Sequence, residues 1–456
     1  IIERLPHDRM RTVQERLTLL RVCHGQKVTL PMELSSVSVA LLAGGLGTRL
    51  RSVVADRPKV LAEIRSQPFL TYLLDQVAAA GCRSVVLCTG YLGEQIETAF
   101  GKSYGPLRLI YSREQEPLGT AGALKLAITR FESDPVLVMN GDSFCAIDIK
   151  AYWDWHRQRQ ATASMALTRV ARSDRFGRVK LDTDARVIEF VEKQQGSGAA
   201  WINAGIYFLS QEVLRSIPDG VNVSLEREVF PRWMGRGLYG YVSTGAFLDI
   251  GTPDDFAVAE SFFAGLNGSA RRRFVILDRD GTIIEEREYL SQPEQVALIS
   301  GAGAALRKLH QMGFGLVMIT NQSGIGRGYF DQAQLGLVHE RLAQLLKQEN
   351  VKLDGIYVCP HTPDDVCACR KPKTSLMEKA AKELDFDLEG SIVIGDKDCD
   401  IDMGRRAGAM TFLVRTGYGA QFENAVAADF VVDDLAAATA SIGCLMGAER
   451  TIIHGH

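Results

Sequence analysis

The sequence lacks the features that define several large classes of protein. It has no run of 18 apolar residues, and its start, Ile1-Ile2-Glu3-Arg4, lacks the apolar core of a signal peptide. The formal net charge is only -3, which gives no basis for a nucleic-acid-binding surface. No tract is biased enough in composition to indicate disorder. We therefore expect a globular, cytoplasmic protein that binds neither membranes nor nucleic acids.

A disulfide framework is not indicated either, although the chain has nine cysteines. Cys82, Cys88 and Cys145 lie in or beside apolar runs. Such surroundings are typical of buried thiols in a reducing compartment, so we expect these cysteines to be core residues.

The organisation of the chain indicates two domains. A length of 456 residues is too great for one ordinary core. Buried strands alternate with helices from residue 37, and the alternation restarts at residue 274 after a stretch rich in turn formers and arginines. This pattern predicts two α/β domains, each a doubly wound, mostly parallel sheet in a three-layer arrangement. We expect an N-terminal extension of unassigned role at 1–36, a first domain at 37–264, a linker at 265–273 and a second domain at 274–440.

The expected strands of the first domain cover 37–43, 84–88, 107–111 and 136–139, with a helix at 69–80. Those of the second domain cover 274–277, 314–319, 355–358 and 391–395, with helices at 301–312, 332–348 and 374–384.

A glycine-rich loop follows the first expected strand. Gly44, Gly45 and Gly47, with Thr48 and Arg49, stand between that strand and a helical region. Glycines in such a loop let backbone N–H groups approach phosphate oxygens, and an arginine can neutralise their charge. The loop is therefore a candidate phosphate site.

Two further features favour a nucleotide site. Lys59, after Pro58, places an ammonium within reach of a polyphosphate. Gly119, Thr120 and Gly122 open a helix after a turn, where a flat base could lie against the backbone.

Two aspartates complete the candidate site of the first domain. Asp142 follows a buried strand, and Asp249 lies in Phe247–Pro253. The carboxyl ends of strands are where open α/β sheets bind ligands, and paired carboxylates suit Mg²⁺. A sugar 1-phosphate is already ionised, so its attack on the α-phosphorus of a nucleoside triphosphate needs alignment and charge cancellation, which metal, Arg49 and Lys59 could supply.

Residues 37–260 resemble the sugar-1-phosphate nucleotidyltransferase family, with the elements GGxGTRL, PK, GTAGA, NGD and DIGTP in order. The stretch Leu42–Ile96 is most similar to the D-glycero-α-D-manno-heptose 1-phosphate guanylyltransferases. The resemblance implies that Asp142 and Asp249 hold the metal, that Lys59 contacts phosphate and that the base is guanine.

The resemblance also implies a triphosphate site at Gly44, Gly45, Gly47, Thr48 and Arg49, a base site at Gly119, Thr120 and Gly122, and a sugar site at Gly177, Glu192, Lys193 and Asn203. Gln194 departs from the family, in which many members carry proline, and this leaves the Lys193 contact open.

The second domain begins with a more specific motif. The apolar strand at 274–277 ends in Asp278-Arg279-Asp280-Gly281-Thr282. Alternation along an emerging strand aims both carboxylates into one site. One carboxylate can attack phosphorus to form an aspartyl-phosphate, and the other can protonate the leaving alkoxide and then activate water.

Three later segments agree with that chemistry. Thr320-Asn321 offers hydrogen bonds to phosphate, Arg370-Lys371 supplies cations, and Asp396 follows another apolar strand. Together with the aspartate motif they resemble the haloacid-dehalogenase-like phosphatases.

This second resemblance implies that Asp278 is the nucleophile and Asp280 the acid/base. Thr320 and Lys371 would hold the phosphoryl group, and Mg²⁺ would be bound by Asp278, the backbone carbonyl of Asp280, and Asp396. We expect Arg279 to support the acids or to lie on the surface, and the neighbours Asp398, Asp400 and Asp402 to orient the loop or cap the next helix.

A compact cluster of soft ligands precedes Arg370. It consists of Cys359, His361, Cys367 and Cys369. Because protein would fill all positions around the ion, the cluster predicts a structural zinc site that pins the loop before Arg370-Lys371.

Two kinds of phosphatase share these motifs, the histidinol-phosphate phosphatases and the D-glycero-D-manno-heptose 1,7-bisphosphate 7-phosphatases. Residues 320–328, Thr-Asn-Gln-Ser-Gly-Ile-Gly-Arg-Gly, resemble the heptose branch. Arg327 is the candidate for binding the distal 1-phosphate, and Asn321 and Arg370 are further candidates for substrate contacts.

The two resemblances combine into one hypothesis. Removing the 7-phosphate of heptose 1,7-bisphosphate yields a heptose 1-phosphate, which the first domain would convert with GTP into a nucleotide-activated heptose. Three alternatives stay open: a mannose- or glucose-1-phosphate nucleotidyltransferase, a histidinol phosphatase, and a non-catalytic nucleotide-sugar sensor that regulates the phosphatase. The sequence also leaves homo-oligomerisation, transfer of the intermediate between the sites, and the base by physics alone open.

Overall fold

The computed structural model describes residues 32–45, 50, 56–170, 177–191, 200–266 and 272–446. Several predicted features therefore lie outside the described residues. These are the extension up to residue 31, most of the linker, and the site residues Gly47, Thr48, Arg49, Glu192 and Lys193.

The N-terminal half (residues 32–266) is built on one large mixed sheet, with the strand order β11-β10-β12-β7-β1-β4-β6-β5. Its centre is parallel, because β1 pairs in parallel with β4 and β7, and β4 pairs in parallel with β6. The central strands are mostly apolar and almost completely buried, as expected of parallel strands. Their bounds are β1 Ser38–Ala43, β4 Ser84–Thr89, β6 Leu107–Arg113 and β7 Val136–Asn140.

An antiparallel extension widens this sheet and was not predicted. β12 (Ala200–Leu209) pairs antiparallel with β7 and with β9 (Ala163–Val170), and β13 (Leu238–Val242) pairs in parallel with β9. The other strands of this half are β2 Glu63–Ile64, β3 Gln67–Pro68, β5 Ser103–Tyr104, β8 Ser143–Cys145, β10 Arg178–Leu181, β11 Val187–Val191 and β14 Phe247–Asp249.

The helices of the N-terminal half follow the strands. They are α2 Phe69–Ala79, α3 Gly93–Phe100, α4 Gly119–Ala127, α5 Ile149–Gln158, α6 Gln211–Arg215, α7 Phe230–Trp233, α8 Pro253–Ala257 and α9 Ala259–Gly265, with the short 3₁₀ helices η1 Leu34–Ser36, η2 Lys59–Leu61 and η3 Ile128–Arg130 and the π-helix η4 Leu225–Val229.

The C-terminal half (residues 272–446) is a separate, wholly parallel sheet, with the strand order β17-β16-β15-β18-β19-β20. The strands are β15 Phe274–Leu277, β16 Gly315–Asn321, β17 Gly355–Cys359, β18 Ile392–Gly395, β19 Met410–Val414 and β20 Phe430–Val432. The helices are α10 Ala302–Gln311, α11 Ser323–Gly326, α12 Gln332–Gln348, α13 Ser375–Leu384, α14 Asp398–Arg406, α15 Gly419–Phe422 and α16 Leu435–Met446, with the 3₁₀ helix η5 Pro293–Gln295.

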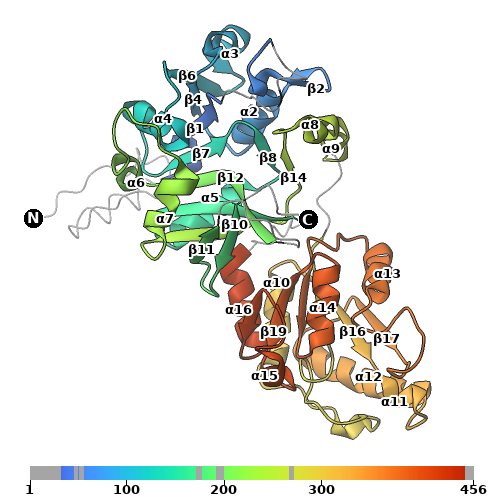
Figure 1. Ribbon diagram of the computed structural model, residues 1–456. Coiled ribbons are helices and arrows are strands. Elements are labelled where there is room, and N and C mark those ends of the chain that lie inside the picture. The colour runs from blue at the N-terminus through green and yellow to red at the C-terminus, as the bar shows by residue number, and fades with distance from the viewer. Residues whose placement is uncertain are drawn as a thin grey trace, which may run out of the picture.

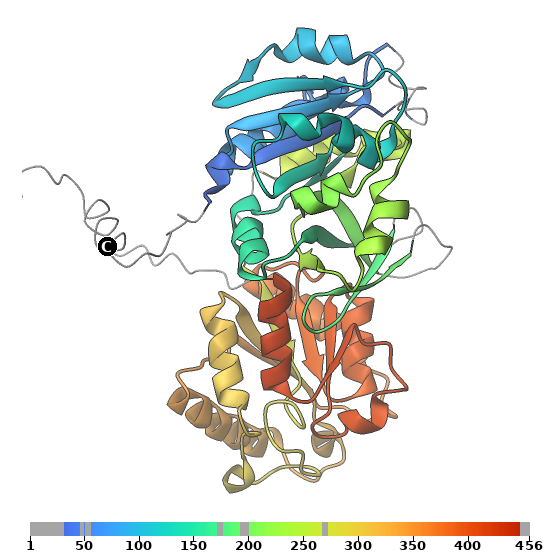
Figure 2. The ribbon, with the colours of Figure 1, turned by 90° about the vertical axis from the view of Figure 1, so that its left-hand side faces the viewer.

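The two halves stack end to end, and α16 stands at their junction (Figures 1 and 2). One apolar cluster is continuous across the junction and includes Tyr241 of β13 together with Ile442 and Leu445 of α16. The halves are therefore packed against each other as well as joined by the chain.

The predicted fold class, two α/β domains built on doubly wound sheets, is confirmed. The helix predicted at 332–348 coincides with α12, and each predicted strand agrees with an observed one to within two residues at either end. Among the described residues, no helix combines the length and the apolar character needed to cross a membrane.

Candidate functional site

The first site is a cavity of about 540 Å³ at the carboxyl ends of β1 and β7. Its volume is in the range of small-molecule sites. Six predicted residues line it: Gly44, Gly45, Lys59, Gly119, Thr120 and Asp142. The lining also includes polar side chains that were not predicted, those of Glu114, Asn140, Asn222 and Glu226. The cavity therefore joins the predicted phosphate, base and metal segments.

Lys59 lies between the two predicted metal-binding carboxylates. Its ammonium is 3.1 Å from Asp142 Oδ2 and 4.0 Å from Asp249 Oδ1. Burial, together with the nearby charge of Asp142, raises the pKa of Asp249 above its usual range. The pair therefore concentrates negative charge, which the ammonium of Lys59 partly neutralises.

The glycines of the base segment are explained mainly by packing of the chain on itself. A Cβ at Gly119, where φ is +72°, would lie 2.5 Å from the carbonyl oxygen of Val223. A Cβ at Gly122 would lie 2.7 Å from the carbonyl oxygen of Val221. Gly119 lines the cavity, but Gly122 is not among the lining residues.

Glu114 is a half-buried acid in the cavity wall. Its Oε2 accepts a hydrogen bond from the backbone N–H of Leu118 at 3.1 Å. Burial raises the pKa of Glu114, and this hydrogen bond offsets part of the effect. Among the described residues, no lysine or arginine forms an ion pair with this carboxylate. Glu114 is positioned by the end of β6 and the turn before α4. It belongs to none of the motifs found in the sequence.

A chain of hydrogen bonds joins the base segment to the predicted sugar segment. Thr120 Oγ1 donates to Glu226 Oε2 at 3.0 Å, and the Tyr207 hydroxyl donates to Glu226 Oε1 at 3.5 Å. The amide of Asn203 donates to the Tyr207 hydroxyl at 2.7 Å. Glu226 lies in the π-helix η4, a rare form that often occurs at functional sites. Gly177, the remaining described sugar-side candidate, is half-buried directly before β10.

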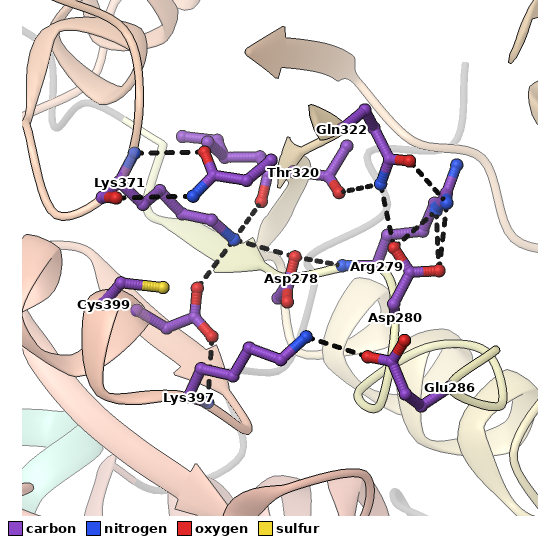
Figure 3. A network of polar contacts seen from close by, with 12 residues as sticks. Asp278, Arg279, Asp280, Glu286, Thr320, Gln322, Lys371, Lys397 and Cys399 are labelled. Atoms are coloured by element: carbon purple, nitrogen blue, oxygen red, sulfur yellow. Dashed lines mark hydrogen bonds and ion pairs between the residues drawn. The ribbon is translucent and has the colours of Figure 1, made fainter. Parts of the chain in front are cut away.

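The second site lies at the carboxyl ends of β15, β16 and β18 and is centred on Asp278 (Figure 3). Asp278 is 7% exposed. Its Oδ1 accepts hydrogen bonds from Lys371 Nζ and from the backbone N–H of Arg279, both at 2.7 Å. No hydrogen bond from the described residues reaches Oδ2, so that oxygen stays available as a nucleophile.

Arg279 is buried and holds the Asp280 carboxylate. It is 1% exposed, so the alternative that it lies on the surface is wrong. Its Nε lies 3.1 Å from both carboxylate oxygens of Asp280 (Figure 3). Gln322 Nε2 donates to Asp280 Oδ2 at 2.9 Å and to Thr320 Oγ1 at 2.8 Å. The acid/base candidate is therefore fixed in place by groups that follow the ends of β15 and β16.

His339 of α12 extends this network away from the site. Arginine only donates, so the His339 Nε2 atom, 3.3 Å from Arg279 Nη1, accepts the hydrogen bond. Burial and the charge of Arg279 lower the pKa of His339 to about 4, which keeps the ring neutral.

Lys371 is a buried cation between two acids. Its Nζ lies 2.7 Å from Asp278 Oδ1 and 2.6 Å from Asp400 Oδ1, and the lysine side chain is 2% exposed. Burial opposes the charge, but the two carboxylates outweigh it and raise the pKa of Lys371. The side chain of Asn321 forms hydrogen bonds with both the N–H and the carbonyl of Lys371. Asn321 thus holds the loop that presents the lysine.

Asp396 is the second carboxylate of a candidate metal site. Ligand oxygens of Asp278, Asp396 and Asp400 all lie within 4.8 Å of one another. Burial, and next the charge of Asp278, raise the pKa of Asp396 to about 8. Asp396 Oδ1 is buried and has no hydrogen-bond partner in the described part of the chain. A Cβ at Gly281, the glycine of the aspartate motif, would overlap this carboxylate.

Several further polar and aromatic groups, exposed or half-buried, belong to the loops and helix ends of the C-terminal half. Arg327 is exposed at the C-terminal end of α11. The rings of Tyr289 and Tyr329 meet edge to face with centroids 4.7 Å apart. Lys397 Nζ donates to Glu286 at 2.8 Å (Figure 3). Arg370 precedes Lys371, and its guanidinium donates to the carbonyl oxygen of His361 at 3.0 Å.

The predicted soft-ligand cluster is assembled. Ligand atoms of Cys359, His361, Cys367 and Cys369 lie within 4.8 Å of one another. Neighbouring ligand atoms are 3.2 Å to 3.9 Å apart. A tetrahedron of zinc ligands has edges of roughly 3.3–3.8 Å, whereas a disulfide bond measures about 2.05 Å. The cluster therefore fits a tetrahedral metal ion and not a disulfide.

Each half of the chain matches a known family. Residues 38–264 match the family described as Nucleotidyl transferase, and residues 368–438 match the family described as HAD-hydrolase-like. The chain is 37% identical over 221 residues to the D-glycero-α-D-manno-heptose 1-phosphate guanylyltransferase of Aneurinibacillus thermoaerophilus, which covers 48% of this chain and 95% of that protein. It is 38% identical over 229 residues to the mannose-1-phosphate guanylyltransferase of Mycobacterium tuberculosis, and that match spans 49% of this chain but only 64% of that relative.

The C-terminal half is similar to a solved structure, the D,D-heptose 1,7-bisphosphate phosphatase of B. bronchiseptica complexed with magnesium and phosphate. The identity is 34%, the match covers 37% of this chain and 97% of that one, and the TM-score is 0.36. The chain therefore belongs to the nucleotidyl transferase family through its N-terminal half, and residues 368–438 of its C-terminal half match the HAD-hydrolase-like family.

Proposed function

We propose that the chain carries out two consecutive reactions of nucleotide-activated heptose synthesis. The C-terminal half removes the 7-phosphate of D-glycero-D-manno-heptose 1,7-bisphosphate, and the N-terminal half transfers GMP from GTP to the resulting heptose 1-phosphate, releasing pyrophosphate. One observation carries the proposal: a half 37% identical to a heptose 1-phosphate guanylyltransferase is joined to a half 34% identical to a heptose bisphosphate phosphatase. The product of the second half is the acceptor that the first half needs.

In the phosphatase reaction Asp278 Oδ2 attacks the phosphorus of the 7-phosphate, and the bond from phosphorus to the sugar oxygen breaks. Asp280 gives a proton to the leaving alkoxide, because an alkoxide is a poor leaving group. Water then attacks the aspartyl-phosphate, Asp280 accepts its proton, and phosphate leaves with Asp278 restored. Lys371 offsets the negative charge of the transferring phosphoryl group, and Lys371 and Thr320 orient it.

Asp278 and Asp396 fit Mg²⁺ at this site. The supporting observations are the unpartnered buried oxygen of Asp396 and the clustering of its carboxylate with that of Asp278. Bound Mg²⁺ would neutralise the phosphate and the carboxylates that surround it, so that an anionic nucleophile can approach an anionic substrate.

In the transferase reaction an oxygen of the sugar 1-phosphate attacks the α-phosphorus of GTP, and the bond between the α-phosphorus and the bridging oxygen of the leaving pyrophosphate breaks. The acceptor is already ionised, so no general base is needed. Lys59 supplies positive charge at the cavity wall, and Asp142 and Asp249 would hold Mg²⁺ beside it, which would offset the charge of the triphosphate.

Glu114 supports guanine as the base. Guanine presents two adjacent donors, N1–H and N2–H₂, on its Watson–Crick edge, and a carboxylate can accept both at once. The other common bases offer a single donor group there, flanked by acceptors that a carboxylate would repel. A half-buried acid in the cavity wall that no described cation neutralises therefore favours GTP.

We assign zinc to the Cys359, His361, Cys367 and Cys369 cluster. A closed site with four protein ligands fits a structural ion, and Arg370, which contacts the carbonyl of His361, connects the cluster to the Lys371 loop. Free thiols throughout the described residues and a nucleoside triphosphate donor both suit the cytoplasm.

A second candidate acceptor for the transferase is mannose 1-phosphate, because the identity to the mycobacterial mannose-1-phosphate guanylyltransferase is 38%. The C-terminal half favours heptose over mannose, because the phosphatase that it resembles acts on a heptose bisphosphate.

The test is to incubate the full chain with heptose 1,7-bisphosphate, Mg²⁺ and each nucleoside triphosphate in turn, and to follow phosphate and pyrophosphate separately. We expect phosphate with every nucleotide and pyrophosphate only with GTP. A chain that releases pyrophosphate with mannose 1-phosphate far faster than with heptose 1-phosphate would contradict the proposal.

A further inference from the structure

The contacts between the two halves lie at one edge of the phosphatase sheet. Thr411 is near the start of β19, and Asp429 directly precedes β20, so both lie at the amino edge of the sheet. Helix α16 follows the end of β20 and runs back toward that edge, and Cys444 lies in its last turn. Asp429 contacts Thr411 of its own half and Arg169 of the transferase half. Cys444 contacts Trp155 of the transferase half. The transferase half is therefore docked on the amino edge, opposite the carboxyl edge that carries Asp278 and Asp396.

An ion pair joins the halves at this edge. Arg169 Nη1 lies 2.7 Å from Asp429 Oδ2, and the two side chains are 6% and 20% exposed. The same oxygen accepts hydrogen bonds from the backbone N–H and the hydroxyl of Thr411, each at 2.8 Å. Asp429 is thus held rigidly by its own half while it binds the arginine of the other. Loss of either partner would leave the other as an uncompensated, largely buried charge.

On the transferase side, Arg169 belongs to the strand pair that carries the sugar-side segment. It lies in β9, in register with Trp201 of β12, and its guanidinium is 5.5 Å from the centroid of the Trp201 ring. Asn203 follows two residues later on β12 and connects through Tyr207 to Glu226 in the cavity wall. A continuous set of contacts therefore leads from Asp429 to the first site.

A second contact at the same edge does not lead to the cavity. The carbonyl of Cys444, one of the last four of α16, accepts hydrogen bonds from Trp155 Nε1 and from Arg159 Nη2, both at 2.6 Å. Side chains of the transferase half thereby cap a helix of the phosphatase half, and a cation at a helix C-terminus is favourable. Arg159 offers a matched control, because it stabilises the docking without contacting β12.

We propose that the phosphatase half positions the sugar-side strands of the transferase half, with Arg169 as the positioning residue and Asp429 as its anchor. The inference rests on the proposed transferase function. It assigns the phosphatase half a second role, which is to hold the end of the β9–β12 pair so that the acceptor site keeps its shape. Binding of the sugar 1-phosphate, but not of GTP, then depends on a contact at the opposite end of the phosphatase from its own active site.

The test uses the full chain with Arg169→Met, Asp429→Asn, the double variant and, as control, Arg159→Met. We expect the KM for heptose 1-phosphate to rise roughly tenfold in Arg169→Met and Asp429→Asn, since small misplacements of binding groups are costly. The double variant should resemble either single one, because the two residues act as one unit. The KM for GTP and the phosphatase kcat/KM should stay within about twofold of wild type, and Arg169→Lys, which keeps the charge, should recover part of the affinity.

Thermal unfolding separates this role from a purely structural one. Arg159→Met and Arg169→Met should both lower the Tm by several degrees. An unchanged KM for heptose 1-phosphate in Arg169→Met, with a Tm decrease equal to that of Arg159→Met, would overturn the inference while leaving the proposed function intact. A wild-type chain that uses another sugar 1-phosphate would refute the proposed acceptor instead, and the same variants titrated with that acceptor would still decide the inference.

Discussion

Lys371 Nζ lies 2.7 Å from Oδ1 of Asp278, and both side chains are almost completely buried. The contact occupies one oxygen of the carboxylate and leaves the other for attack on phosphorus. Because Asp400 contacts the same ammonium at 2.6 Å, Lys371 also compensates the second acid. The proposed role of Lys371 is therefore twofold: it binds phosphate, and it stabilises the folded state by neutralising two buried carboxylates.

This relationship predicts a double effect of Lys371→Met. The variant leaves two buried carboxylates without their cation, which costs about 3–5 kcal/mol of folding stability. We expect phosphatase activity to fall by on the order of 10³-fold or more and the Tm of the C-terminal half to drop. Phosphate release and calorimetry measure the two effects, and pyrophosphate release from supplied heptose 1-phosphate serves as the internal control. Retention of near wild-type phosphate release would show that Lys371 is dispensable.

Glu114→Gln tests the base assignment. Glutamine keeps the shape of the side chain but replaces one acceptor by a donor, so it cannot accept both guanine donors. We expect the kcat/KM for GTP to fall by roughly 10- to 100-fold, since a hydrogen bond to a charged group contributes about 1.5–3 kcal/mol. The kcat/KM for ATP and UTP, measured in the same assay, should change by less than about threefold. An equal loss for all nucleotides would point to a structural role for Glu114.

The cysteine cluster predicts one zinc ion per chain in the purified protein. Cys369→Ser should lose that zinc and, because Arg370 and Lys371 follow directly, should lose most phosphatase activity. Elemental analysis and phosphate release measure the two consequences. Cys444→Ser is the matched control, since its thiol lies outside the cluster and should leave the zinc content unchanged. A full zinc content in Cys369→Ser would disprove the assignment.

The docking geometry predicts that the intermediate passes through solvent. The transferase half covers the amino edge of the phosphatase sheet, while Asp278 and Asp396 lie at its carboxyl edge. Labelled heptose 1,7-bisphosphate, supplied with an excess of unlabelled heptose 1-phosphate, should give nucleotide-activated heptose diluted to the label content of the free pool. Product that keeps the label content of the bisphosphate would require direct transfer between the sites.

Much of this arrangement could be predicted from the sequence because parallel strands bring their carboxyl ends to one edge. The motifs at Asp142 and Asp278 each follow an apolar strand, and the ligands of the cysteine cluster are close in sequence. Local spacing was therefore sufficient to group these residues, although their chemical roles stay predictions.

The remaining features depend on contacts between segments that are distant in sequence. Glu114 and Glu226 reach the first cavity from a turn and a π-helix that no periodicity marks. Arg279 is flanked by acids in the sequence, and its burial depends on distant groups that surround it, Gln322 directly after β16 and His339 of α12. The pairing of Arg169 with Asp429 joins residues 260 positions apart, and neither lies in a motif.

The measurement that tests the central claim most directly is made on Asp278→Asn in the full chain. One incubation contains heptose 1,7-bisphosphate and GTP, a second contains heptose 1-phosphate and GTP, and phosphate and pyrophosphate are followed in both. We expect phosphate release from the bisphosphate to fall by on the order of 10⁴-fold or more, with pyrophosphate release from heptose 1-phosphate at the wild-type rate. Loss of both activities, or survival of phosphate release, would contradict the claim that the chain carries two independent active sites.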